Sequence, residues 1–414
     1  MSSVVPDGWE AKELGDIATF SGGSAFKEMY QGENSGKHPF IKVSDMNLPE
    51  NNRYIVQANN WVSEEIRQQA KIKLFPSDSV VFAKVGAALL LNRRRQLVRE
   101  TAIDNNMMAA IPNTCDHNFL YYSMQRIDLA NIVQSGAVPS VNQSQMESIP
   151  TITPPLPEQK KIASILTSVD EVIENTQKQI DKLQDLKKAT MNELLTKGIG
   201  HTEFKDSELG RIPKSWEVVE LSSLVNSTRP ITYGIVQTGE HIPYGIPCVR
   251  VVDIVQGKPI LERMIRTTQQ INDSYSRTVL QENDIMFALR GNIGFVRKVE
   301  SFLRGANLTR GIALISNSEE ITSDYLLYAL QSQVVRRQIA DGVNGSALQE
   351  IPLGNLRTVK VPVPCKTEQT GISKVIASLD KLIETSLLKL SQTQSLKKSL
   401  MQDLLTGKVR VTVN

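Results

Sequence analysis

The chain has 414 residues, of which 40% are hydrophobic and 22% are charged, and its formal net charge is +3 at pH 7. This length favours two or three domains, and no apolar run approaches the ~18 residues that a membrane-spanning helix needs. The N-terminus lacks the pattern of a secretory signal, and the three cysteines lie outside any CxxC spacing. We therefore expect a cytoplasmic protein without a disulfide scaffold or a zinc site.

A first mixed α/β module is predicted at residues 1–156. Apolar runs indicate strands at residues 40–43, 80–83 and 107–111, and helical spacing indicates a helix at residues 119–132. The second of these strands runs into a glycine turn at Gly86, with the cation Lys84 beside it.

A long helix is predicted next, at residues 157–198. Pro157 suits the first turn, Glu158 complements the positive helix end, and Gly198 is a stop signal. Forty residues at 1.5 Å each would form a rod of roughly 60 Å, which needs a partner for its apolar stripe. The stripe residues taken as the partner interface are Ile162, Val169, Ile173, Ile180 and Leu183.

The remaining chain repeats this plan. We predict a linker at residues 199–212, a second module at residues 213–364, a second long helix at residues 365–407 and a tail at residues 408–414. The second module should contain strands at residues 249–252, 285–288 and 311–315 and a helix at residues 324–339. The interface residues of its helix are Ile372, Leu379, Ile383, Leu390 and Leu396.

The two helices are copies of each other, because residues 158–196 recur without a gap at residues 368–406. We expect α+β modules with two long antiparallel coiled-coil helices and an internal pseudo-twofold repeat. Parallel pairing is the alternative, but antiparallel pairing lets equivalent surfaces meet. Thr176 and Ser386 place hydroxyls at matching inward positions, as ordinary packing or as a device that fixes register.

The modules match at scaffold positions and differ in their loops. Trp9, Asp45, Asp78 and Gly86 correspond to Trp216, Asp253, Asp284 and Gly291. In contrast, residues 21–37 do not resemble residues 226–244, and residues 89–106 differ from residues 292–310. Because loops carry recognition, this pattern is typical of two readers of different targets.

Local cations, rather than a basic domain, are the candidate DNA contacts. Both modules are nearly neutral, and the positive excess lies in the last sixty residues. The arginines after the first glycine turn have a predicted counterpart in Arg297 and Lys298 and could neutralise phosphates or reach guanine edges; the alternative is a solvated turn. The candidate residues are Lys42, Lys84, Arg93, Arg94, Arg95, Tyr233, Arg250, Arg290, Asn292, Arg297 and Lys298.

Some of these candidates have structural alternatives. Lys42 and Arg250 are predicted to be equivalent, as are Lys84 and Arg290, but salt bridges to the matched aspartates would explain the first pair equally well. Three loop tyrosines could stack on bases or simply anchor their loops: Tyr30, Tyr233 and Tyr244.

Motifs for independent catalysis are missing. The sequence has no Walker GxxxxGK[ST] loop, no GxGxxG that opens a helix and no HExxH spacing. The segment Thr153-Pro154-Pro155-Leu156 lacks the amide and the aromatic residue of a methyltransferase motif, and we interpret it as a linker. We expect no catalytic residues and no metal site in this chain.

These features together resemble the specificity (S) subunit of type I restriction-modification systems. The resemblance rests on the repeated Trp-Glu segment, on PPLPEQKKIASIL opening a helix that ends NELLTKGI, and on the bridge FKDSELGRIPKSW between the halves. It covers essentially the whole chain. It implies that each module is a target-recognition domain for one half of a split DNA sequence. It also implies that the helices set the gap between the half-sites and dock two modification (methyltransferase) subunits.

The resemblance also implies that restriction subunits join this core. S-adenosylmethionine, ATP and Mg would then be bound by the partner subunits, with no cofactor in this chain. The main alternative is a coiled-coil adaptor between proteins, with no DNA specificity of its own. An enzyme with an unrecognised site is the reading that the absent motifs support least.

Overall fold

The computed structural model describes residues 5–133, 138–345 and 349–412. The chain divides into two compact units, one formed by Met1–Lys178 with Leu388–Asn414 and the other by Gln179–Leu387. Each unit therefore joins one module to part of both long helices. The unit boundaries fall inside the helices, whereas the predicted domain boundaries fall at the junctions between module and helix.

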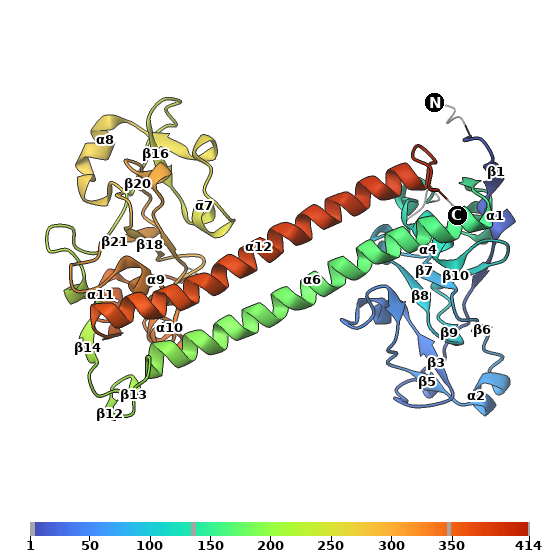
Figure 1. The fold of residues 1–414 in the computed structure, drawn as a ribbon, viewed down its shortest axis with the longest axis horizontal. Coiled ribbons are helices and arrows are strands. Elements are labelled where there is room, and N and C mark those ends of the chain that lie inside the picture. The colour runs from blue at the N-terminus through green and yellow to red at the C-terminus, as the bar shows by residue number, and fades with distance from the viewer. Residues whose placement is uncertain (1–4, 134–137, 346–348, 413–414) are drawn as a thin grey trace. The chain divides into compact units, whose positions relative to one another are not determined.

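The first unit is built around two sheets (Figure 1). One has the order β2-β10-β7-β8-β4 and the other the order β5-β3-β9-β6, while β1 pairs with β11. Its strands are β1 (Glu10–Glu13), β2 (Ala18–Gly22), β3 (His38–Ile41), β4 (Tyr54–Ile55), β5 (Trp61–Val62), β6 (Leu74–Phe75), β7 (Val80–Ala83), β8 (Arg94–Leu97), β9 (Thr101–Ile103), β10 (Met107–Pro112) and β11 (Pro150–Thr153). Its helices are α1 (Leu14–Ile17), α2 (Glu64–Gln69), α3 (Ala87–Leu90), α4 (His117–Gln125), α5 (Gln143–Glu147) and the first part of α6 (Leu156–Lys197).

Strand β7 separates two apolar cores of the first unit. Its side chains alternate, so Val80 and Phe82 pack with residues of α4 and α6, whereas Val81 packs with residues of the second sheet. All four residues of β7 are buried, which explains why the strand reads as a continuous apolar run rather than as an alternating one.

The second unit repeats this plan. Its main sheet has the order β15-β21-β18-β19, a second sheet has the order β17-β16-β20, and β14 pairs with β22. Its strands are β12 (Phe204–Ser207), β13 (Gly210–Pro213), β14 (Glu217–Glu220), β15 (Thr232–Tyr233), β16 (Ile246–Val249), β17 (Ile265–Thr267), β18 (Ile285–Ala288), β19 (Val296–Lys298), β20 (Asn307–Leu308), β21 (Ile312–Ile315) and β22 (Lys360–Val363). Its helices are α7 (Val251–Val255), α8 (Gln269–Ser274), α9 (Ser323–Gln331), α10 (Gln333–Asp341), α11 (Leu353–Arg357) and the first part of α12 (Lys366–Leu404).

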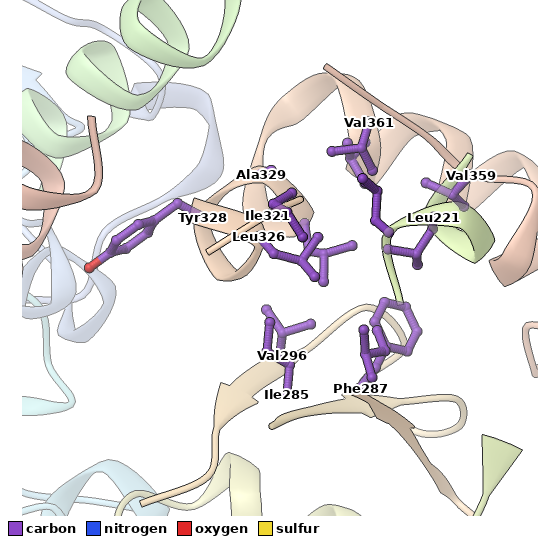
Figure 2. Close-up of a cluster of buried hydrophobic side chains, with 14 of the residues drawn as sticks. Leu221, Ile285, Phe287, Val296, Ile321, Leu326, Tyr328, Ala329, Val359 and Val361 are labelled. Atoms are coloured by element: carbon purple, nitrogen blue, oxygen red, sulfur yellow. The ribbon is translucent and has the colours of Figure 1, made fainter. Parts of the chain in front are cut away.

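The larger of two apolar cores of the second unit lies between its main sheet and α9. Figure 2 shows Ile285, Phe287 and Val296 of the sheet below Leu326 and Ala329 of α9. Residues from both long helices complete this cluster, namely Leu195 of α6 with Ile372 and Ile376 of α12. The helix ends therefore belong to the same core as the module.

Several predicted elements differ from the observed ones. Residues 251 and 252 begin α7 instead of extending a strand, because the carboxylate of Asp253 accepts a bond from the backbone N–H of Arg250 and caps the turn. The helix predicted at residues 324–339 is broken at Ser332, whose hydroxyl caps α10. The predicted helix at residues 119–132 ends at Gln125, and the predicted linker contains the β12–β13 hairpin.

The long helices α6 and α12 pack together with a heptad seam. Inward residues are spaced alternately by four and three positions, which is the pattern of a left-handed coiled coil. The seam residues of α6 are Ile162, Leu166, Val169, Ile173, Thr176, Ile180, Leu183 and Lys187, and those of α12 lie 210 positions later. Within the described ranges, no helix has the length and apolar character needed to cross a membrane.

Candidate nucleic-acid interface

Strand registers determine which residues of the two modules are equivalent. In the β7–β8 pair, Arg94 lies opposite Phe82, and in the β18–β19 pair, Val296 lies opposite Phe287. Arg297 is therefore the counterpart of the residue after Arg94. The predicted match between the arginine cluster and Arg297-Lys298 holds at this one position only.

Arg94 is a core residue rather than a surface contact. Its side chain is buried, with bonds from its guanidinium to Asn92 Oδ1 at 3.0 Å and to the carbonyl of Ile127 at 2.7 Å. Burial lowers the pKa of Arg94 to about 10. We do not retain Arg94 as a candidate DNA contact, because its donors point into the protein.

The other two arginines of the cluster differ in exposure. Arg95 donates to the carbonyls of Asn51, Arg94 and Met46, and burial lowers its pKa. Arg93 is exposed and contacts the side chain of Asn47. Arg93 is thus the member of the cluster that a phosphate or a base could reach without rearrangement.

Arg297 and Lys298 are both partly buried in the second module. Burial lowers the pKa of Arg297, and Lys298 forms an ion pair with Asp324 in the first turn of α9. The ion pair joins β19 to α9, which gives Lys298 a structural role beside any contact with DNA.

The equivalent cations Lys42 and Arg250 have different partners. Arg250 forms a two-pronged ion pair with Asp253, with N–O distances of 2.9 and 3.0 Å, and this pair raises the pKa of Arg250. The ammonium of Lys42 instead bonds to Gln31 and lies 5.7 Å from the ring centre of Phe26. The salt-bridge alternative therefore applies to Arg250 and not to Lys42.

The predicted equivalence of Lys84 and Arg290 is wrong. Ala83 pairs with Met107 as Ala288 pairs with Ile312, so the next residue, Lys84, matches Leu289. Arg290 forms an ion pair with Glu350. The exposed Asn292 lines a groove of about 500 Å³ together with Arg336.

The predicted equivalence of Asp78 and Asp284 is also wrong. The backbones of Asp78 and Asn283 both lie in the left-handed region, so Asp78 matches Asn283.

Two of the three candidate tyrosines lie on the surface of the second module. Tyr233 ends β15 with 40% of its surface exposed, and Tyr244 is almost completely exposed. A turn holds Tyr244, because the N–H of Gly245 donates to Ile242 and Arg266 donates to the carbonyl of Gly245. Tyr30 of the first module is partly buried in a short helical turn.

The predicted interface residues of the helices lie in the seam, with one exception. Leu396 is 52% exposed and lies beside the seam rather than in it. Its counterpart in the repeat, Leu186, is exposed to nearly the same extent. The hydroxyls of Thr176 and Ser386 bond to carbonyls of their own helices, at 2.7 and 2.8 Å. These bonds favour ordinary packing over a register-fixing contact.

Lysine–aspartate pairs across the seam show that the helices are antiparallel. In the first unit Lys397 of α12 pairs with Asp170 of α6 at 2.6 Å, and in the second unit Lys187 of α6 pairs with Asp380 of α12 at 2.5 Å. The two pairs are exact counterparts in the repeat. Tyr122 and Tyr328 donate to the same two aspartates, at 2.7 and 3.0 Å, and so tie each module to its ion pair.

A second matched contact, which the sequence did not reveal, closes each unit. The indole N–H of Trp9 donates to Glu158 at 3.2 Å, and that of Trp216 donates to Glu368 at 3.0 Å. Glu158 also receives two 2.8 Å bonds from Arg410. The matching Trp and Glu positions in the repeat could have predicted this contact. From the sequence alone, each glutamate is instead explained by its place in the first turn of a helix, where a negative charge is favourable.

The partner of the second glutamate differs from that of the first. Glu368 lies 2.8 Å from a ring nitrogen of His201 and accepts the backbone N–H of Ile199 at 2.9 Å. A chain segment that follows the end of one long helix thus packs against the glutamate that begins the other helix. The contact therefore fixes where the two helices start and stop against each other in both units.

Comparisons with known proteins agree with this internal symmetry. Residues 6–185 and residues 213–393 each match the family model described as the type I restriction modification DNA specificity domain. The chain is 28% identical to the MjaVIII specificity subunit of Methanocaldococcus jannaschii, over 98% of this chain and 94% of that protein. It is 24% identical to the EcoBI specificity subunit of Escherichia coli, over 91% of this chain and 80% of that one.

Solved structures show the same fold. The S subunit of a type I restriction-modification system from M. genitalium aligns with 100% of this chain and 98% of its own, with a TM-score of 0.59 and 15% identity. A second structure, from a study of type I complex assembly, aligns with 98% of this chain with a TM-score of 0.58.

Proposed function

Because the chain belongs to the type I restriction-modification DNA specificity family and is a specificity subunit with two recognition domains, we propose that each module reads one half of a bipartite DNA target. The observation that carries this proposal is that the modules share strand registers but differ in their surface residues. Matched strands keep the two readers alike in backbone, and different side chains give them different targets.

We further propose that α6 and α12 set the gap between the half-sites. The support is the repeated lysine–aspartate pair, which gives both units one antiparallel register. The chain itself contributes no catalytic residue in this proposal. Methyl transfer, with S-adenosylmethionine, and translocation, with ATP and Mg, belong to modification and restriction subunits.

Footprinting tests the proposal directly. With its methyltransferase partner present, the chain is expected to protect two short DNA blocks that flank a gap of unrestricted sequence. Uniform protection, or none, would contradict the reader and would favour the coiled-coil adaptor without DNA specificity.

The docking site for modification subunits is proposed at apolar positions beside the seam. Val172 and Leu396 in the first unit, and Leu186 and Leu382 in the second, are 42 to 52% exposed. The register of the lysine–aspartate pairs places the two members of each couple at the same level of the helix pair. Such residues widen the apolar stripe beyond the two-helix seam, which is what a third packed helix requires.

Charge placed in one couple should remove one partner. For the double variant Leu186→Asp with Leu382→Asp, we expect native mass spectrometry to find one modification subunit per chain where the wild type binds two. A partner helix would have to bury both carboxylates, which is costly. The Val172→Asp with Leu396→Asp variant should lose the other copy.

The control adds a charge on the outer side of α6, at the exposed Asn175. Asn175→Asp should keep both copies. Retention of two copies by the double variants would place the docking surface elsewhere.

A further inference from the structure

One surface position of the main sheet carries different chemistry in the two modules. Met108 of β10 pairs with Gly22 of β2, and Ala313 of β21 pairs with Tyr233 of β15. Met108 and Ala313 are themselves equivalent, because each also lies opposite the phenylalanine of the matched central strand. Gly22 and Tyr233 therefore occupy the same place in the sheet.

The backbone beyond this position is also the same in both modules. A Cβ on Gly23 would lie 2.2 Å from the carbonyl of Asp104, and one on Gly234 would lie 2.0 Å from the carbonyl of Leu308. Only glycine fits so close to a crossing strand. The two modules thus share the path of the chain, and the exchange of Gly22 for Tyr233 is a change of side chain on a fixed frame.

In the first module the space above Gly22 holds the ammonium of Lys84. Lys84 Nζ lies 2.9 Å from where a Cβ of residue 22 would be. Lys84 is partly buried, and within the described ranges its ammonium has no hydrogen bond or ion pair. The hydroxyl of the neighbouring Ser21 accepts a hydrogen bond from the ammonium of Lys73. Lys73 likewise forms no ion pair with any described residue.

In the second module the same site is apolar and aromatic. Leu289, the counterpart of Lys84, is 2% exposed, and the ring of Tyr233 is at the surface. Thr278 is the counterpart of Lys73, because each lies ten residues before the end of the central strand of its module. Thr278 is buried, and its hydroxyl donates to Asn307. Both cations are therefore replaced, and a large ring stands where the first module has only backbone.

An ammonium without a counter-charge at a partly buried site attracts a hydrogen-bond acceptor. A fixed glycine frame limits where that acceptor can lie. Among the groups that DNA offers, the N7 and O6 atoms of guanine in the major groove are the acceptors that lysine reads, whereas a tyrosine ring suits apolar contact such as the thymine methyl group.

We propose that this strand-end site, defined as residues 22 and 84 in the first module and residues 233 and 289 in the second, determines base preference in each half-site. Lys84 donates to a guanine edge in the first half-site, and Tyr233 makes an apolar contact with a base in the second. The inference rests on the proposed function, that the modules read DNA, and names the residues that do so.

The test uses the full chain assembled with its modification subunits. Competition binding with probes that vary one base pair at a time, and sequencing of methylated genomic DNA, report the two half-sites separately. Lys84→Leu is expected to reduce discrimination at one guanine of the first half-site by about tenfold, the effect of losing one specific base contact. The second half-site should be unchanged.

Two further variants and one control separate the contact from folding. Gly22→Ala keeps the charge but displaces the ammonium, and it should lower discrimination at the same base pair. Tyr233→Gly should alter only the second half-site. Lys160→Leu removes an exposed lysine of α6, and it should leave both half-sites as they are.

The outcomes distinguish this inference from the proposed function. Equal weakening on all sequences, with a shallower salt dependence, would mean that Lys84 contacts a phosphate, and the specificity role would be wrong. If the Lys84→Leu variant recognises the same bipartite motif as the wild type, the inference is wrong. The proposed function, that the modules read DNA, would still stand. If the wild-type complex has no bipartite motif, the proposed function itself fails.

Discussion

Deletion of one central heptad from each long helix is expected to shorten the gap between the half-sites by about three base pairs. The segments are residues 176–182 of α6 and residues 386–392 of α12. Seven helical residues span about 10 Å, and each base pair of B-DNA rises about 3.4 Å. The base sequences of the half-sites should not change, because both modules keep all of their residues. Sequencing of methylated genomic DNA measures the gap and the half-sites together.

The choice of these heptads follows from the observed register. Asp170 pairs with Lys397 and Lys187 pairs with Asp380, so the two deleted segments face each other and lie between the ion pairs. Both ion pairs and the seam phase are kept, since a whole heptad is removed.

The control deletes the heptad from α6 alone. It should abolish methylation, because the two helices then differ in length between the ion pairs. Only one of the two lysine–aspartate pairs can form at a time. A double deletion that changes the half-site bases would contradict the role of the helices as a spacer.

Replacement of Glu158 by glutamine is expected to destabilise the first unit. Its side chain is almost fully buried and receives the indole N–H of Trp9 and the guanidinium of Arg410. A hydrogen bond to a charged group contributes about 2 kcal/mol, and more is lost when its buried partner is left unpaired. For a unit of this size we expect a decrease in Tm of about 6 °C, measured by calorimetry.

The effect should depend on pH in a defined direction. Burial opposes ionisation of Glu158, but the bonds from Arg410 and Trp9 outweigh it and hold the pKa below its ordinary value. A lowered pKa stabilises the folded chain above the ordinary glutamate pKa, and this contribution is lost as the pH falls. The Tm difference between wild type and Glu158→Gln should therefore be largest near neutral pH and should shrink in acid.

The control is Glu171→Gln, at an exposed position of the same helix. It should show neither the decrease in Tm nor the pH dependence. A difference in Tm for Glu158→Gln that persists unchanged in acid would show that the charge of Glu158 is not what stabilises the unit.

The long helices and central strands could be predicted from sequence because their patterns are local. Residues 80–83 and 285–288 are buried on both sides, and their continuous apolar runs identify them without knowledge of their neighbours. The seam is equally visible, apart from Lys187 and Lys397. These lysines occupy seam positions because an aspartate of the other helix lies opposite, and that partner is known only once the register is known.

The surface assignments needed information that the sequence does not contain. In the sequence, Arg94 looks like part of an exposed basic cluster. In the structure, its guanidinium donates a hydrogen bond to the carbonyl of Ile127, which lies more than thirty residues away in the sequence. The sequence segments around Gly22 and Tyr233 show no visible resemblance, and only the strand pairing with β10 and β21 shows that the two residues correspond. The break at Ser332 was hidden because the apolar periodicity continues across it.

The composition of the two units has a consequence for how the chain matures on the ribosome. The second unit is one continuous stretch, Gln179–Leu387, whereas the first unit combines the beginning of the chain with Leu388–Asn414. The core of the module made first is therefore incomplete until residues 388–414 are made, because its apolar residues Ile162 and Leu166 pack in the same cluster as Leu404 and Leu405. The module made second has its complete core earlier. A nascent chain that stops after residue 387 would therefore carry all residues of the second unit and a first unit that lacks residues 388–414.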